Sequence, residues 1–121
     1  MASKYNLGGV AYVKVGGRQI ALRGNLKLSP EMEEEEGVTG QDGPHGFLTK
    51  PKMPFFEGDF STVADISIEE LRALKDETWQ VELNNGKSYI FSDARVTAAM
   101  EIDTAQGQFT MRVDAMNARR I

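Results

Sequence analysis

The alternation of apolar and polar side chains near the start of the chain predicts a β-hairpin. Residues 10–15 and 18–28 have the pattern of strands, and Gly16-Gly17 between them suits a two-residue turn because glycine adopts positive φ freely. The second strand has a period of two. Its apolar face carries Ile20, Leu22, Leu26 and Leu28, and its polar face carries Gln19, Arg23, Asn25 and Lys27. One face is therefore expected to be buried and the other wet.

Two further hairpins are predicted in the second half of the chain. Residues 78–83 and 87–91 alternate on either side of Asn85-Gly86, a signal for a type I′ turn. The last pair of strands is expected to be joined through residues 104–107. Its apolar faces would carry Val96, Ala98, Met100 and Ile102 on one strand, and Phe109, Met111 and Val113 on the other.

A short helix is predicted between the first and second hairpins. Ser67 and Glu70 have the spacing of a capping box, in which each side chain bonds the other residue's backbone amide. Ile66 and Leu71 are placed for a hydrophobic staple. The helix is expected to end near residue 75 or 76. Before it, residues 47–60 predict an irregular, proline-interrupted lead-in that ends in a short strand.

Residues 29–46 show neither a helical nor a strand period. They contain a proline, the run Glu33 to Glu36, and glycines at 37, 40, 43 and 46. We interpret this segment as a long Gly/Glu-rich loop. Such a loop is unusual within a compact domain, and loops of this kind tend to be functional or to become ordered on a partner.

Together the predicted elements indicate an α+β fold that is mainly β. The simplest architecture is an antiparallel β-sandwich or a partly closed barrel, with one short flanking helix. The length of 121 residues suits one hydrophobic core, so a single domain over residues 1–121 is expected.

Composition and charge narrow the function classes. The chain is 40% hydrophobic and 26% charged, as in soluble globular proteins, and its apolar runs are far shorter than the roughly 20 residues of a membrane-spanning helix. It has no cysteine, and its start lacks the pattern of a secretory signal, so a cytoplasmic product is expected. The net charge of −4 is opposite in sign to the basic surface that tight nucleic-acid binding requires.

No pattern in the sequence indicates catalysis, a cofactor or a metal site. His45 is the only histidine, which excludes a multi-histidine metal site within one chain. The stretch from Asn85 to Ser88 imitates the end of a phosphate-binding loop, but Val81 stands where the first glycine is required. The glutamate run lacks the alternating ligands of a calcium loop. We therefore expect a protein that is not an enzyme.

Several stretches resemble one family across nearly the whole chain. They are residues 11–17 (AYVKVGG), 22–25 (LRGN), 36–47 (EGVTGQDGPHGF), 54–59 (PFFEGD) and 83–89 (LNNGKSY), together with the helix after Ser67. In order and spacing they are similar to the tail tube proteins of Mu-like contractile phages and related defective prophages. The stretch from Glu36 to Phe47 is the most specific of them.

The resemblance implies a β-sandwich with a flanking helix, which assembles as hexameric rings stacked into a tube inside a contractile sheath. DNA would pass through the lumen without specific binding. The implied partners are other copies of the chain, the tail sheath protein, the tape measure protein, the baseplate hub initiator and the tail terminator, with no membrane and no cofactor. The implied location is the virion tail tube, after synthesis in the cytoplasm of a bacterial host.

Two sets of residues are candidates for assembly. The predicted loop would stack one ring on the next, and its candidate residues are Glu36, Gly37, Val38, Thr39, Gly40, Gln41, Asp42 and Gly43. The polar faces of the first and last hairpins would line the lumen, with candidates Gln19, Arg23, Asn25, Thr97, Glu101, Gln108 and Thr110. A net-negative subunit would repel DNA phosphates and keep transit free of sticking.

Two alternatives remain open. One is a tube protein of a contractile bacteriocin or a type VI secretion machine, which shares the architecture. The other is a small monomeric or dimeric β-domain that binds a ligand or peptide, with the glycine-rich segment as its lid.

Overall fold

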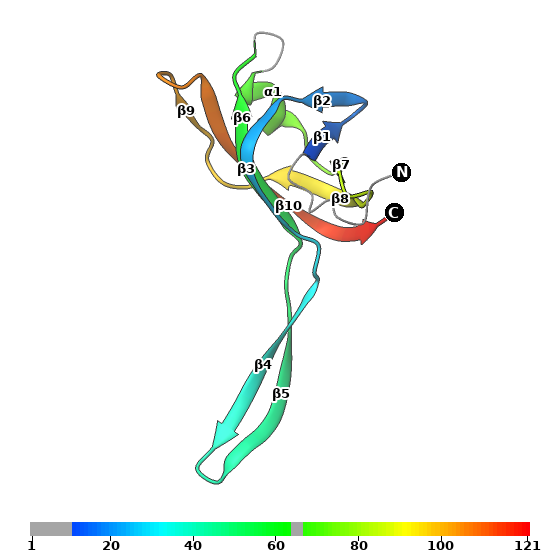
Figure 1. The fold of residues 1–121 in the computed structure, drawn as a ribbon, viewed down its shortest axis with the longest axis vertical. Coiled ribbons are helices and arrows are strands. Elements are labelled where there is room, and N and C mark those ends of the chain that lie inside the picture. The colour runs from blue at the N-terminus through cyan, green and yellow to red at the C-terminus, as the bar shows by residue number, and fades with distance from the viewer. Residues whose placement is uncertain (1–10, 64–66) are drawn as a thin grey trace.

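A computed structural model describes residues 11–63 and 67–121, which form ten strands and one short helix (Figure 1). In chain order they are β1 (Ala11–Val15), β2 (Arg18–Ile20), β3 (Leu22–Ser29), β4 (Glu33–Gly40), β5 (Gly43–Pro51), β6 (Phe55–Ser61), α1 (Ile68–Ala73), β7 (Glu77–Leu83), β8 (Ser88–Val96), β9 (Glu101–Asp103) and β10 (Gln108–Arg120).

Eight of these strands form one antiparallel sheet, and β4 and β5 form a separate two-stranded ribbon. The order in the large sheet is β2-β1-β7-β8-β10-β6-β3, with β9 on β10. Because β3 at one end of this order comes close to β1, the second strand from the other end, the sheet nearly closes into a barrel. The predicted class, mainly β with one short helix, is confirmed, and the partly closed barrel is the architecture found.

The barrel interior is filled by aromatic and branched side chains. The ring of Phe56 packs against Trp79 and Phe91, with ring centroids 5.6 and 5.1 Å apart, and all three side chains are fully buried. Phe60 stacks on Phe109 at 5.8 Å. These rings come from β6, β7, β8 and β10, so the core holds together strands that are distant in sequence.

The first hairpin is confirmed, but its second strand is shorter than predicted. Gly16 and Gly17 both have positive φ (57° and 80°) and form the turn, and β1 pairs with β2 from Val15–Arg18 to Val13–Ile20. The strand is interrupted at Ala21, whose carbonyl accepts from Ser61 N at 2.8 Å. From Leu22 onward the chain pairs with β6 instead of β1. The period of two continues across this change of partner, which is why the sequence indicates one strand.

The second hairpin is also confirmed, with a different turn type. Gly86 N donates to the Leu83 carbonyl and Leu83 N donates to the Lys87 carbonyl, at 3.3 and 2.9 Å. Gly86 has a φ of 89°, whereas Asn85 is not among the residues with positive φ. A type I′ turn requires positive φ at both of its central residues. The hairpin therefore has a type I turn followed by a glycine bulge at Gly86.

The third hairpin is only partly as predicted. β9 pairs with β10 over three positions, and Ala98 and Ile102, expected on the apolar face, are exposed. The long partner of β10 is β8, which runs unbroken from Ser88 to Val96. Asp93 in β8 has a φ of 52°, and the buried positions shift from Phe91 to Ala94 across it. This irregularity makes one strand look like two in the sequence.

The helix begins where the capping box predicts. Ser67 is the N-cap, and its hydroxyl accepts from Glu70 N at 3.2 Å. The Glu70 carboxylate lies 3.4 Å from Arg18 Nη1 on β2. The helix ends at Ala73, slightly earlier than expected, because Leu74 is already extended. Ile66, the predicted staple residue, lies outside the described residues.

The predicted loop over residues 29–46 is wrong, because this segment contains the last residue of β3, all of β4 and the start of β5. β4 and β5 pair from Glu33–Pro51 to Gly40–Gly43, so residues 47–51 are strand as well. Neither face of the ribbon is covered, and a strand with two wet faces has no reason to alternate apolar and polar residues. Pro51 at the end of β5 and the buried Pro54 mark the return to the barrel.

Candidate assembly surfaces

The most prominent surface is the arm, defined here as residues 31–52, which comprises β4, β5 and their flanks. It leaves the barrel as an extension of β3 and β6 and projects well beyond it (Figure 1). All of its residues except Val38 and Gly43 are exposed, and Phe47 is exposed by 78%. A two-stranded ribbon without a covering layer is only marginally stable in water. The arm is therefore suited to contact with another molecule.

The two faces of the arm have similar chemistry. Cross-strand partners share a face, so Glu34 and Glu36 lie with Lys50 and Leu48, respectively. On the opposite face, Glu35 lies beside Thr49, and Phe47 is opposite Gly37. The Lys50 ammonium pairs with the Glu36 carboxylate. Each face thus presents carboxylates beside an exposed apolar side chain.

The tip of the arm holds the second half of the predicted ring-stacking set. Nε2 of His45 lies 2.7 Å from Oδ1 of Asp42. The imidazole ring also covers Gly40, where a Cβ would collide with it. This hydrogen bond is the main reason that the pKa of Asp42 lies below its ordinary value. Gly43 has a φ of 126°, in the region that favours glycine.

Most of the predicted lumen-facing residues come together on the outer face of β3, β6, β10 and β9. Asp59 on β6 is their common acceptor: Asn25 Nδ2 and Thr110 Oγ1 donate to its two carboxylate oxygens at 2.8 and 2.9 Å. Glu101 on β9 is the cross-strand partner of Thr110. A polar row therefore runs across four strands.

A second row lies next to the first. Arg23 Nε donates to Ser61 Oγ at 3.2 Å, and its guanidinium also contacts the carbonyl oxygens of Gln106 and Gly107. Gln108 is the cross-strand partner of Ser61. Arg23 thus ties β3 to the β9–β10 turn across the end of β6.

The remaining two candidates lie apart from this group. Thr97 follows β8, and its amide donates to the Arg112 carbonyl at 3.1 Å, which places it beside β10. Gln19 lies on β2, at the other end of the strand order. Asp59 and Ser61, which organise the polar rows, were missed. The alternation of Phe56, Gly58 and Phe60 with Glu57, Asp59 and Ser61 is the signal that points to them.

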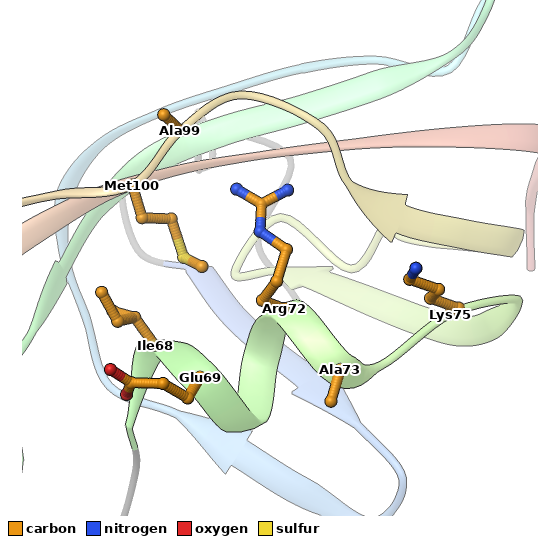
Figure 2. Close-up of a pocket in the computed structure, with 7 residues that line it drawn as sticks. All are labelled: Ile68, Glu69, Arg72, Ala73, Lys75, Ala99 and Met100. Atoms are coloured by element: carbon orange, nitrogen blue, oxygen red, sulfur yellow. The ribbon is translucent and has the colours of Figure 1, made fainter.

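A shallow apolar depression lies beside the helix (Figure 2). It has a volume of about 540 Å³ and is lined by Ile68, Glu69, Arg72, Ala73, Lys75, Ala99 and Met100. Arg72 donates from Nη1 and Nη2 to the carbonyl oxygens of Val96 and Ala98, at 2.7 and 2.8 Å. The arginine therefore fixes the segment after β8, and its donors are engaged by backbone.

Within residues 11–63 and 67–121 no group of His, Cys, Asp and Glu side chains is arranged to hold a metal ion. In the same part of the chain, no helix has the length and apolar character needed to cross a membrane. The polar side chains of the two rows form hydrogen bonds with each other across strands.

The chain belongs to the phage tail tube protein family, whose model matches residues 5–120. This family is structural and not enzymatic. The resemblance seen in the sequence is thereby confirmed at the level of the family. No curated protein sequence matches the chain.

Solved structures share the fold of this chain at 12% sequence identity. Hcp1 from Flavobacterium johnsoniae has a TM-score of 0.59, with 91% of this chain and 93% of that chain covered. A chain of the extracellular contractile injection system PVC, from the sheath/tube terminator in the extended state, has a TM-score of 0.59, with 100% of this chain and 96% of that chain covered. A chain of the anti-feeding prophage tube-terminating cap has a TM-score of 0.62, with 100% of this chain and 94% of that chain covered.

Proposed function

We propose that this chain forms hexameric rings that stack into the inner tube of a contractile phage tail, through which DNA is ejected. Membership of the phage tail tube protein family supports the proposal that the chain forms a tube. The arm is the observation that supports stacking: it is an exposed ribbon with no core of its own, and it extends away from a barrel that has its own core. A segment of this kind gains most from a contact between subunits.

The rings would form through the open edges of the sheet. β2 and β3 are the terminal strands of the order, so each has one side without a sheet partner. Unpaired strand edges add neighbouring strands readily, and in a ring each edge would be covered by the next subunit. A closed ring removes the edges that would otherwise lead to aggregation.

The polar outer face of β3, β6, β9 and β10 would face the lumen. It carries five of the candidate residues, namely Arg23, Asn25, Glu101, Gln108 and Thr110. Arg23 donates to Ser61, and Asn25 and Thr110 donate to Asp59, so fewer donors remain for DNA phosphates. Gln19 and Thr97 belong to the same proposal, although they lie apart from this face.

The partners and the location are part of the same proposal. The proposed partners are a tail sheath around the tube, a tape measure protein within it, a baseplate hub initiator at one end and a tail terminator at the other. The tube would be found in the virion tail, after synthesis in a bacterial host. DNA is cargo in this account and not a ligand.

The fold comparisons favour one alternative within the same class. One of the reported structures comes from an extracellular contractile injection system and another from an anti-feeding prophage cap, so a bacteriocin or secretion tube is the second candidate. Both candidates share the ring and the stack. They differ in whether DNA or protein passes through the lumen.

Shortening the arm tests the stacking role. Deletion of residues 33–36 together with their partners 48–51 removes four cross-strand pairs and keeps the tip in register. Because the arm does not pack on the core, the circular dichroism spectrum and the melting temperature should stay close to those of the full chain. Tubes should be absent from electron micrographs. A control substitution, Lys75→Ala on the barrel, should leave tubes intact; tubes from the shortened chain would refute the stacking role.

Cysteine labelling tests the lumen assignment, since the natural chain has no cysteine. In Thr110→Cys and in the control Glu69→Cys, the thiol should react with a bulky maleimide in the free subunit. After tube formation only the Thr110 position should be protected. Equal labelling of both positions in tubes would place this face on the outside.

A further inference from the structure

The charge of the chain is unevenly distributed between arm and barrel. Of the 14 Lys and Arg residues, the arm holds Lys50 and Lys52, and of the 18 Asp and Glu residues it holds six. The remaining 12 residues of each sign balance one another. The whole formal net charge of −4 therefore belongs to residues 31–52. Two arms would repel each other, so the surface that receives an arm must be basic or neutral.

The barrel offers one surface with matching chemistry, here called the basic patch. It consists of Lys87, Arg119, Arg120 and Ile121. Arg120 lies opposite Tyr89 and Arg119 opposite Ile90, while Ile121 N donates to the Ser88 carbonyl at 2.9 Å. These pairings bring the end of β10 beside the β7–β8 turn that carries Lys87.

The three cations of the basic patch are exposed and form no ion pair with any described residue. The nearest acid on the facing strand is Glu82, which is opposite Ser88 and is held by Lys14 at 3.3 Å. Ile121 is exposed by 65%. The patch thus combines free cations with an apolar side chain, and the arm combines free carboxylates with Phe47 and Leu48.

We propose that the arm of one subunit docks on the basic patch of another copy. This inference rests on the proposed function and specifies one contact within the stack. The carboxylates of Glu34 and Glu35, one on each face of the arm, pair with Arg119 and Arg120. In the same contact, Phe47 or Leu48 of the arm covers Ile121 of the basic patch. Charge sets the register, and apolar burial holds the docked arm.

The position of the two surfaces explains why such a contact repeats. The arm projects from the far end of β3 and β6, whereas the C-terminal end of β10 lies at the side of the barrel (Figure 1). Because the two surfaces lie at different places, one copy can use its arm and its basic patch at the same time, each with a different neighbour. A contact between two different surfaces of the same chain passes from copy to copy and builds a ring or a continuous stack.

Charge reversal in the full-length chain tests this contact. The arm variant is Glu34→Lys with Glu35→Lys, and the patch variant is Arg119→Glu with Arg120→Glu. Each should weaken self-association in sedimentation velocity by at least about tenfold, because like charges then face each other. The variant with all four substitutions should associate again to within about threefold of the natural chain. A control with the same change in net charge as the arm variant, Glu69→Lys with Glu77→Lys, should associate normally.

Salt provides an independent readout of the same contact. Exposed charges act over about 10 Å at 0.1 M salt and about 3 Å at 1 M. Association of the natural chain should therefore weaken steeply over this range, and the four-substitution variant should show the same slope. Circular dichroism of all variants should match the natural chain, since the altered residues are exposed.

The outcomes separate the contact from the proposed function. Tubes formed equally well by the arm and patch variants refute the contact and leave the tube intact as a proposal. Failure of the four-substitution variant to recover also refutes it. If only the arm variant loses association, the arm docks on a surface other than the basic patch. A natural chain that never forms rings or tubes refutes both.

Discussion

His45 and Asp42 are joined at the tip of the arm, where the imidazole Nε2 lies 2.7 Å from the carboxylate Oδ1 and the ring covers Gly40. The three residues belong to the most specific stretch of the family resemblance. The bond joins the β4–β5 turn to β5, and the ring lies over Gly40 at the end of β4. It sets the shape of the part of the molecule that is proposed to meet the next ring.

The tip should respond to acid. The hydrogen bond from His45 holds the pKa of the Asp42 carboxyl below its ordinary value of 3.8. A lowered pKa means that the bond stabilises the tip above pH 3.8 and is lost as the pH falls through the lowered value. Carbon-detected NMR titration should place the Asp42 pKa below 3.8, and His45→Ala should return it toward 3.8. A titration at 3.8 or above in the natural chain contradicts the bond.

Gly40→Ala should have the same local effect without unfolding the chain. The new Cβ would collide with the imidazole ring, and His45 is exposed and able to turn away. The Asp42 pKa should then rise as it does in His45→Ala, and adding His45→Ala should change nothing further. The melting temperature should stay within about 2 °C of the natural value, since surface changes have small effects on stability. A large loss of stability would show that the tip supports the barrel.

Two phenylalanines should separate folding from assembly. Phe56 is fully buried against Trp79 and Phe91, so Phe56→Ala should cost about 3–5 kcal/mol of unfolding free energy. Phe47 is exposed by 78%, so Phe47→Ala should change stability by less than about 0.5 kcal/mol. Urea titration followed by fluorescence of Trp79 measures both. Phe47→Ala should nevertheless reduce tube formation; a stability loss like that of Phe56→Ala would mean that the arm folds onto the barrel.

Arg72 should be needed for the segment after β8. Its guanidinium donates to the carbonyl oxygens of Val96 and Ala98, and Arg72→Ala leaves both without this donor. The expected loss is about 1.5–3 kcal/mol, the range for hydrogen bonds to charged groups. Arg72→Lys should recover only part of it, because an ammonium lacks the planar fork that reaches two acceptors. Amide exchange at residues 97–100 should rise in both variants, and unchanged exchange would argue against the bridge.

The sequence predicts the fold best where one face of a strand is buried. The alternation in β3 and β7, the turn at Gly16-Gly17 and the position of the turn at Gly86, though not its type, were predicted correctly because burial and backbone geometry leave a local signal. The arm was missed for the opposite reason, since neither of its faces is covered. The irregularity at Asp93 hid the length of β8 by changing which residues face the core.

The candidate surfaces were predictable to different degrees. Asn25, Thr110 and Glu101 were placed on one polar face by alternation, and they do lie together around Asp59. The basic patch was not foreseen, because Lys87 and Arg120 become neighbours only through the pairing of β8 with β10. The assembly itself was suggested by family resemblance and not by periodicity.

Negative-stain electron microscopy of the purified chain, combined with sedimentation velocity over a wide concentration range, tests the central claim most directly. The account predicts six-membered rings or hollow tubes in the heavy fractions, with an amount that rises with concentration. A chain that remains a monomer at every concentration, and that is not added to tubes when a preformed baseplate is supplied, would contradict it.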